Sequence, residues 1–140
     1  MSTEESLISA KASLEAYNAK DWDAARASMS EGCVYSEAAT HLMAEGIEAI
    51  LDAWKGWATA IPDSKATIED SYVIDNGAVL ELTWRGTHTG PMMGPEGEIP
   101  ASGNSFEMKA CQVIEVEGDK AVSIRHYFDI GTMMSQLGLG

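Results

Sequence analysis

Residues 65–89 read KATIEDSYVIDNGAVLELTWRGTHT, and this stretch decides the fold class. Two runs of strand-forming residues flank Asp75-Asn76-Gly77, a sequence typical of a tight hairpin turn. Alternate residues of the second run share one face of a strand, because successive strand side chains point to opposite faces. On this face are Leu80, Leu82, Trp84, Gly86 and His88. The stretch therefore predicts two long antiparallel strands, over residues 65–75 and 79–89.

More strands follow this hairpin towards the C-terminus. Residues 104–116 and 120–129 have the same composition and are separated by a Glu-Gly-Asp turn. Between the hairpins, residues 90–103 are rich in glycine and proline and predict a long loop. Residues 131–139 predict a short helical or coiled tail.

Towards the N-terminus, apolar residues recur at helical spacing. The pattern predicts helices over residues 3–18, 21–32 and 47–61, with a short extended piece over residues 33–37. Helices followed by hairpins indicate an α+β fold, in which helices pack on one face of an antiparallel sheet. Strands of ten or more residues must bend in so small a domain. We therefore expect a cone-shaped curved sheet with three N-terminal helices enclosing an apolar cavity.

The composition fits one globular domain over residues 1–140, with 45% hydrophobic residues. With 9 basic and 22 acidic residues, the formal net charge is −13. Such a surface repels phosphate backbones and anionic membranes, so we expect neither nucleic acid nor a membrane as partner. The acidic N-terminus lacks the features of a signal peptide, which suggests a cytoplasmic location. Cys33 and Cys111 have no metal-type spacing, and we expect two free thiols.

Two polar residues lie among apolar neighbours on the last two predicted strands. His126 shares a strand face with Val122, Ile124 and Phe128. Gln112 shares a face of the preceding strand with Phe106, Met108, Ala110 and Ile114. In a pocket, the histidine would be a general acid or base and the glutamine its hydrogen-bonding partner. The alternatives are a structural polar pair, or a face covered by a dimer partner.

The remaining candidates have weaker sequence support. His88 ends a strand and reaches either the pocket mouth or only strand-end hydrogen bonds, whereas His41 is expected in a surface loop. Asp129 and Arg125 lie on the face opposite His126, and a bulge could turn Asp129 inward. A metal site made by the three histidines is an alternative, but their positions match no ligand spacing. A Ser/His/Asp triad has no nucleophile-elbow motif to support it.

Aromatic residues and methionines supply the expected wall of the pocket, although aromatic stripes at helical spacing are also typical of a core. Flexible thioethers suit a lid over an apolar ligand. The candidate substrate-binding residues are Tyr17, Tyr35, His41, Trp54, Trp57, Trp84, His88, Met92 and Met108.

Several segments resemble the SnoaL-like polyketide cyclases, members of the nuclear-transport-factor-two-like superfamily. The similar segments are AYNAKDWD (16–23), EGIEAI (45–50), GWATAIPD (56–63), GTHTGP (86–91) with Met93-Gly94, YFD (127–129) and QLG (136–138). They follow the family's order over nearly the whole chain.

We expect a homodimer or higher oligomer, because the outer sheet face is too apolar to be left fully exposed to water; it carries Val79, Thr83, Cys111 and Val113.

The resemblance implies a curved antiparallel sheet, an apolar cavity and frequent homo-oligomers. Family cyclases close a ring by intramolecular aldol condensation without a cofactor. They use an aspartate near the end of the last strand as acid/base, with a histidine on the neighbouring strand beside it. Counting back from Gln136-Leu137-Gly138 places His126 at the aspartate's position and Gln112 near the histidine's. The chain thus departs from the family pattern at its central residue, and Asp129 becomes a separate acid.

A histidine can still transfer protons, since its unperturbed pKa of about 6.5 lies near neutral pH. We expect a cofactor-independent cyclase or isomerase acting on an apolar, oxygenated molecule of polyketide or steroid-like size. His126, Gln112 and Asp129 are its candidate catalytic residues, and no metal is expected. The alternatives are a non-catalytic small-molecule-binding module of the same fold, and a hydrolase or hydratase that positions a water.

Overall fold

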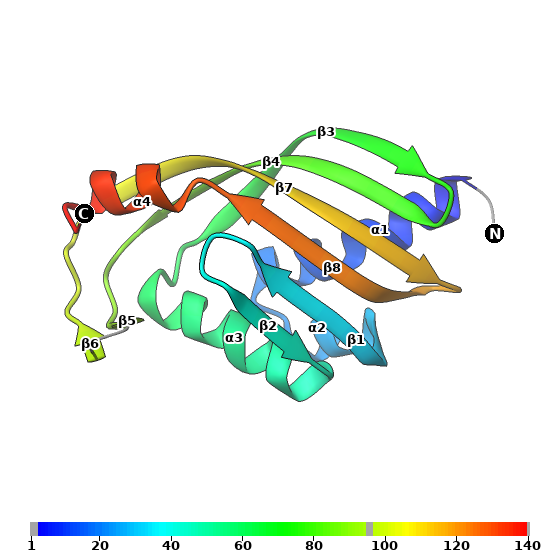
Figure 1. The fold of residues 1–140 in the computed structure, drawn as a ribbon, viewed down its shortest axis with the longest axis horizontal. Coiled ribbons are helices and arrows are strands. Elements are labelled where there is room, and N and C mark those ends of the chain that lie inside the picture. The colour runs from blue at the N-terminus through cyan, green and yellow to red at the C-terminus, as the bar shows by residue number, and fades with distance from the viewer. Residues whose placement is uncertain (1–2, 95–96, 140) are drawn as a thin grey trace.

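A curved six-stranded sheet forms one wall of the molecule in the computed structural model, which describes residues 3–94 and 97–139 (Figure 1). Its strand order is β2-β1-β8-β7-β4-β3. The strands are β1 (Met29–Glu37), β2 (Leu42–Glu45), β3 (Lys65–Ile74), β4 (Gly77–Thr87), β7 (Ser105–Glu117) and β8 (Lys120–Phe128). Neighbouring strands are antiparallel except β1 and β8, which pair in parallel. The predicted α+β class with a curved antiparallel sheet is confirmed.

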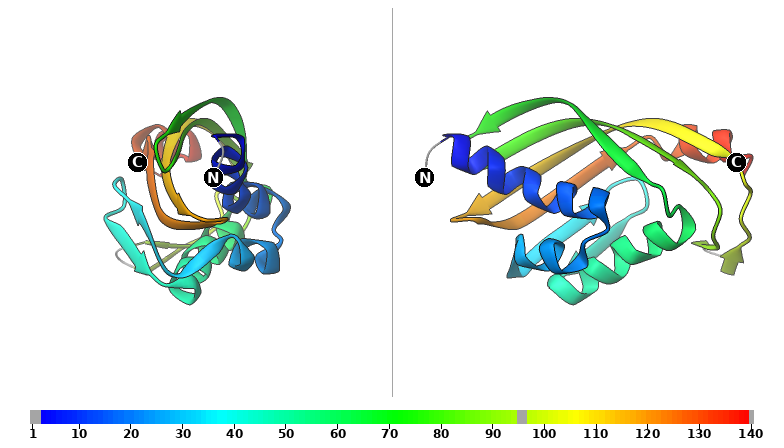
Figure 2. Two further views of the ribbon diagram at one scale, coloured as in Figure 1. Left: turned by 90° about the vertical axis from the view of Figure 1, so that its right-hand side faces the viewer. Right: turned by 180° about the vertical axis from the view of Figure 1, so that it is seen from behind.

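Helices cover the concave side of this sheet, as the end-on view shows (Figure 2, left). They are α1 (Thr3–Ala19), α2 (Trp22–Ala27) and α3 (Ile47–Ala60). The C-terminal helix α4 (Ile130–Leu137) packs against β7 at one end of the sheet (Figure 1). Helix α1 packs across β3, β4, β7 and β8, whereas α3 packs against β1 and β2. The buried apolar side chains of helices and sheet meet in one core between these two layers.

The expected hairpin at residues 75–77 is present, but its glycine has a different role from the one that the turn motif suggests. Asp75 and Asn76 connect the strands, and Gly77 is already paired with Ile74 in the β3–β4 ladder. A Cβ atom on Gly77 would lie 1.8 Å from the carbonyl oxygen of Ile114 on β7. Only glycine therefore allows β4 to approach β7 this closely.

The second helix is shorter than the predicted range 21–32. It ends at Ala27, and the Ser28 backbone N–H donates to the carbonyls of Ala24 and Ala25. The chain then enters β1, where Met29 is paired with Ala121 of β8. Met29 is therefore a strand residue rather than part of a helix face, because pairing with a distant strand overrides local helical periodicity.

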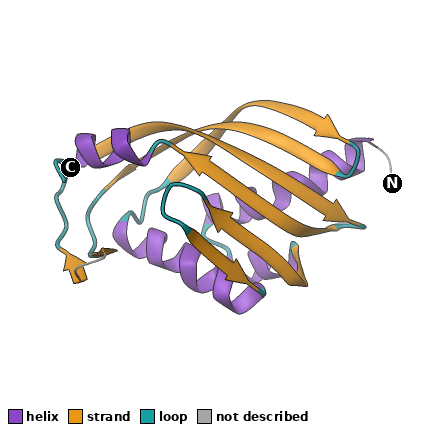
Figure 3. Ribbon diagram, viewed as in Figure 1, coloured by secondary structure: helices purple, strands orange, loops and turns teal. Residues whose placement is uncertain are grey.

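Three short strands were not predicted. Strand β2 follows a turn in which His41 has φ 60°, and it pairs with β1. Within the predicted loop 90–103, β5 (Met92–Gly94) and β6 (Gly97–Ile99) form a separate two-stranded hairpin. Strands of three or four residues carry too little alternation to be recognised in a sequence. Figure 3 separates helices, strands and loops by colour.

A register shift in the β7–β8 pair alters the predicted face of β8. The shift lies between Glu115 and Val116, so Ala121 pairs with Val116 while Ser123 pairs with Glu115. Ala121 is fully buried and Val122 is only half-buried. Val122 therefore leaves the face on which the sequence had placed it, and the irregularity adds to the bend of the sheet.

Of the described helices, none is long and apolar enough to cross a membrane.

Candidate functional site

A cavity of about 50 Å³ lies between the concave face of the sheet and helices α1, α3 and α4. Its wall is mainly aromatic and contains four side chains with uncharged polar groups, those of Ser13, Ser64, Gln112 and His126, besides two tyrosine hydroxyls. The other lining residues are Leu14, Tyr17, Tyr35, Trp54, Trp57, Ile61, Trp84, Phe106, Met108, Phe128 and Met133. A space of this size holds a few water molecules.

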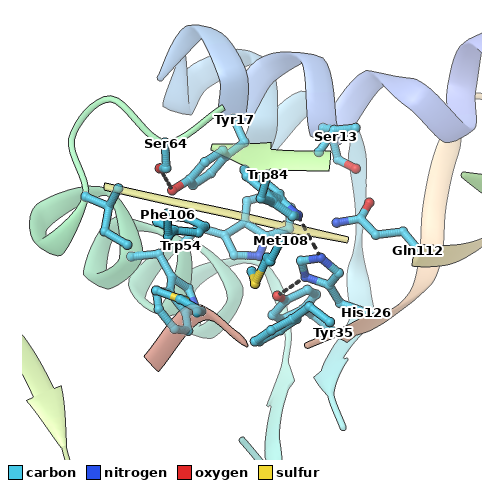
Figure 4. A pocket seen from close by; sticks show the side chains of 15 residues that line it. Ser13, Tyr17, Tyr35, Trp54, Ser64, Trp84, Phe106, Met108, Gln112 and His126 are labelled. Carbon is cyan, nitrogen blue, oxygen red and sulfur yellow. Dashed lines mark hydrogen bonds between the residues drawn. The ribbon is translucent and has the colours of Figure 1, made fainter. Parts of the chain in front are cut away.

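His126 lies in the wall of this cavity, between Trp84 and Tyr35 (Figure 4). It is 6% exposed and pairs with Gln112 on β7 and with Glu37 on β1 in the strand ladders. The Trp84 Nε1–H donates to His126 Nε2 over 3.1 Å, and His126 Nδ1 lies 3.0 Å from the Tyr35 hydroxyl. Both ring nitrogens are therefore hydrogen-bonded.

The protonation of His126 follows from its surroundings. Burial lowers its pKa from 6.5 to about 3, because a charged imidazolium loses its hydration there. The ring is thus neutral near pH 7. An indole N–H can only donate, so Nε2 must accept and the single ring proton lies on Nδ1. Nδ1–H then donates to the oxygen of Tyr35, whose own hydroxyl donates to Glu37 Oε2 over 2.5 Å.

Glu37 is a buried carboxylate beside the cavity that sequence reasoning missed. It is 2% exposed and accepts three hydrogen bonds. The Tyr35 hydroxyl and the Trp57 Nε1–H, at 2.9 Å, donate to Oε2, and the Thr40 hydroxyl donates to Oε1 over 2.7 Å. Burial, the nearby Glu37 charge and the hydrogen bond to it raise the pKa of Tyr35 well above its usual value, so this hydroxyl keeps its proton. The signal in the sequence was the alternation of Cys33, Tyr35 and Glu37, which places the carboxylate on the buried face of β1.

Gln112 lies next to His126 on the neighbouring strand and below Ser13 of α1 (Figure 4). Its side chain is 5% exposed. Among the described residues, no group hydrogen-bonds to its buried Oε1. Unsatisfied buried polar atoms are rare in native proteins, so this amide is available to a bound molecule.

A second polar pair lies across the cavity from His126 (Figure 4). The Tyr17 hydroxyl and the Ser64 hydroxyl are 2.6 Å apart. Burial raises the pKa of Tyr17 to about 12, so this phenol remains protonated. The Trp84 ring contacts Tyr17 edge-to-face, with ring centroids 5.4 Å apart. Because Trp84 also hydrogen-bonds to His126, it connects the Tyr17–Ser64 pair with His126.

Asp129 does not contribute to the cavity, which corrects its place among the candidate catalytic residues. Its side chain accepts hydrogen bonds from the backbone N–H and the hydroxyl of Thr132 and so caps helix α4. These bonds lower the pKa of an exposed carboxylate. Strand β8 ends at Phe128, so no bulge turns Asp129 inward. The carboxylate oxygens of Asp129 instead accept hydrogen bonds at the start of helix α4.

Three candidate binding residues also lie outside the cavity wall. His41 is exposed in the turn before β2, and Met92 belongs to the β5–β6 hairpin. His88 is fully buried, with Nδ1 accepting from the Ser102 backbone N–H over 3.1 Å. The three histidines therefore have separate surroundings, and no metal-binding group of His, Cys, Asp and Glu occurs among residues 3–94 and 97–139. The other predicted binding residues, Tyr17, Tyr35, Trp54, Trp57, Trp84 and Met108, do line the cavity.

A curved sheet closed by helices over an aromatic cavity defines the ketosteroid-isomerase-like, nuclear-transport-factor-two-like class of folds. The chain belongs within it to the SnoaL-like polyketide cyclase family, whose model matches residues 8–137. The resemblance found in the sequence is thus confirmed.

Solved structures share this fold. TsrD from Streptomyces laurentii is similar over 100% of this chain and 99% of its own, with 24% identity and a TM-score of 0.83. IdmH from Streptomyces antibioticus, a proposed polyketide cyclase, is 25% identical, with coverage of 93% and 96% and a TM-score of 0.79. An epoxide hydrolase from M. tuberculosis has 18% identity, coverage of 98% and 92% and a TM-score of 0.74. No curated protein sequence matches the chain significantly.

Proposed function

We propose that this protein is a cofactor-independent acid/base enzyme that cyclises or isomerises a small, mostly apolar, oxygenated molecule. The observation that carries the proposal is His126, a neutral imidazole in an aromatic cavity, with the amide of Gln112 beside it, whose Oε1 has no hydrogen-bond partner among the described residues. Membership of the SnoaL-like family supports a polyketide as the substrate class.

In the proposed reaction, His126 Nε2 exchanges its bond to Trp84 for a proton on a carbon next to a substrate carbonyl. The electrons of the broken C–H bond form an enolate, and Gln112 Nε2–H and the released Trp84 Nε1–H donate to its oxygen. The imidazolium then returns the proton to another carbon, which completes an isomerisation. In a cyclisation, the enolate carbon attacks a second carbonyl of the same molecule and the imidazolium protonates the resulting alkoxide.

The low pKa of His126 affects the two halves of this cycle differently. A pKa of about 3 makes the ring a weak base in the empty cavity and a strong acid once protonated. Return of the proton is therefore favourable, whereas its removal needs stabilisation of the imidazolium. General bases lie closest to their optimum when their pKa is near the working pH.

The size of the cavity bears on the substrate. Pockets for drug-sized ligands have volumes of roughly 300–1,000 Å³, whereas this cavity has about 50 Å³. A polyketide would require unbranched or aromatic wall residues such as Met108 and Phe106 to change rotamer. Met108 has three rotatable bonds and meets this need at little cost.

Hydrogen–deuterium exchange tests the proposal without knowledge of the product. Cyclohexanone and 2-tetralone, two ketones of different size, are incubated with the protein in D₂O, and loss of the α-proton signals is followed by NMR. His126→Ala should lower the protein-dependent rate at least about a hundredfold. Tyr127→Phe, the adjacent residue on the outer face, is the matched control and should leave the rate unchanged. Full activity of folded His126→Ala would contradict the proposal.

A binding module without catalysis is the second candidate, and one observation favours it. Both nitrogens of His126 are occupied by Trp84 and Tyr35, as expected for a structural histidine. Saturable binding of 2-tetralone by the wild type, without exchange of its protons, would select this alternative.

A water-activating hydrolase has less support, since Asp129 lies outside the cavity and no carboxylate lines its described wall.

We also propose that the chain forms a homodimer through the outer face of the sheet. Val79, Cys111 and Val113 are half-buried there, and Tyr127 is 46% exposed. Thr83, on the same face, is fully buried; its hydroxyl donates to Glu69 and accepts from Lys109. Light scattering at micromolar concentration should give twice the 15.0 kDa of one chain, and a monomer mass would contradict the proposal.

A further inference from the structure

Glu37 presents an unexplained cost, because it buries a carboxylate among neutral groups. Its three hydrogen-bond donors, on Tyr35, Thr40 and Trp57, carry no formal charge. A buried charge that is not offset destabilises a protein. The fold nevertheless satisfies the Glu37 carboxylate, since hydrogen-bond donors from β1, the turn after β1 and α3 converge on its two oxygens.

The hydrogen bonds between Glu37 and Trp84 form one chain with a fixed direction. A carboxylate can only accept, so Tyr35 must donate to Glu37 and its oxygen must accept from His126 Nδ1–H. At the other end, the Trp84 indole can only donate and so requires a bare Nε2. Both ends therefore select the same tautomer of His126. The four groups come from three strands, and the β1–β8 pairing places Glu37 beside His126.

We propose that Glu37 is a positioning residue that acts through Tyr35: it holds the ring proton of His126 on Nδ1, leaves Nε2 as the basic atom, and supplies the counter-charge for the imidazolium. The inference rests on the proposed function for its catalytic meaning, but the selection of the tautomer does not.

The counter-charge answers the weakness of His126 as a base. When Nε2 accepts a proton, Nδ1–H still donates to Tyr35 and Tyr35 to the carboxylate, so the new positive charge lies two hydrogen bonds from a negative one. Linked hydrogen bonds of this kind polarise one another in a low dielectric. Of the described side chains, the titratable ones that hydrogen-bond to His126 or Tyr35, or pack on the Trp84 ring, are Tyr35 and Glu37 on β1 and Tyr17 on α1, besides His126 itself. Both tyrosines have raised pKa values and stay neutral. Glu37 is therefore the charged group that can balance the imidazolium.

Nitrogen NMR of ¹⁵N-histidine-labelled protein at pH 7 tests the inference without a substrate. His126 is assigned among the three histidines by the loss of its signals in His126→Gln. In the wild type, Nδ1 should be protonated and Nε2 bare. Glu37→Gln is the matched control, because its carbonyl oxygen can still accept from Tyr35 and Trp57 while its NH₂ faces the Thr40 hydroxyl. This variant should keep the tautomer.

Glu37→Leu removes the acceptor and frees the Tyr35 hydroxyl to donate to Nδ1. The ratio of Nδ1–H to Nε2–H forms should then fall roughly tenfold or more, the effect of losing a hydrogen bond to a charged group. If Glu37→Leu does not fold, Tyr35→Phe breaks the same chain and should lower the ratio similarly. An Nε2–H tautomer in the wild type, an unchanged ratio in the folded variant, or a shift in Glu37→Gln as large as that in Glu37→Leu would overturn the inference.

The charge is tested separately by the exchange assay. Glu37→Gln should lower the protein-dependent exchange rate at least roughly tenfold while the tautomer is unchanged, a combination that a purely structural role would not produce. An unchanged rate would refute the role as counter-charge. Failure of the proposed function would be seen instead as unaltered exchange in His126→Ala, and the tautomer result would stand.

Discussion

The two faces of strand β8 place adjacent residues in opposite electrostatic surroundings. His126 faces the cavity, where burial lowers its pKa to about 3. Arg125 lies on the outer face, where its guanidinium donates to Glu115 over 2.5 Å. This hydrogen bond raises the pKa of Arg125 and lowers that of Glu115, so both remain charged. Adjacent residues of one strand thus lie on opposite faces of the sheet. One face keeps a histidine neutral, whereas the other keeps an arginine and a glutamate charged.

The comparison shows how this fold can hold polar groups inside an apolar cavity. On the outer face, ions are screened by water and each pair contributes little. On the concave face, His126 is kept neutral and is linked through Tyr35 to the buried charge of Glu37. The inner face should therefore dominate both stability and its pH dependence.

The largest difference should be seen in the pH dependence of stability. The unfolded chain takes up a proton at His126 near pH 6.5, whereas the folded chain does so only near pH 3. The contribution of the neutral histidine is therefore complete above pH 6.5 and is lost as the pH falls towards 3, up to about 5 kcal/mol. Compared with His126→Gln, the wild type should lose about 3 kcal/mol between pH 7 and pH 4.5. Urea unfolding at both pH values measures this, and parallel curves for the two proteins would contradict it.

Core packing should give the next largest contrast. Ile124 is fully buried on the concave face of β8, and its truncation to alanine should cost about 3 kcal/mol of unfolding free energy. Val113→Ala, on the half-buried outer face of β7, should cost about 1 kcal/mol by loss of two methyl groups. Chemical denaturation of both variants checks the order. Equal losses would show that the outer face is covered, as in the proposed homodimer.

The smallest effect should come from the ion pair of the outer face. The side chains of Arg125 and Glu115 are 39% and 32% exposed. Replacing Glu115 by Gln should cost less than about 1 kcal/mol, and the difference should shrink in 1 M salt because exposed charges are screened. A larger, salt-independent loss would indicate that this pair is desolvated in an assembly.

The secondary structure could be predicted from the sequence wherever a helix or strand was long. The three helices, the long strands and the hairpin at Asp75-Asn76 all occur. The errors lie where distant segments decide the outcome. Met29 belongs to β1 because it pairs with Ala121, and the face of Val122 depends on a register shift. Neither partner can be read from local periodicity.

The site could be predicted in part for the same reason. Alternation along β7 and β8 placed Gln112 and His126 on one face, and the ladder makes them neighbours. Glu37 was missed because its importance comes from β1 pairing in parallel with β8, a contact between residues 89 positions apart. Asp129 was misjudged because the helix that it caps is built from residues beyond the strand.

The amino-acid sequence by itself determined the α+β class, the family and the inward positions of Gln112 and His126, because periodicity and strand alternation are local properties of a chain. The tertiary structure alone decided the series of hydrogen bonds that runs from Glu37 through Tyr35 and His126 to Trp84. This series in turn decided the tautomer and the charge of the histidine. Those depend on burial and on the direction of hydrogen bonds between separate strands, which exist only once the sheet has formed.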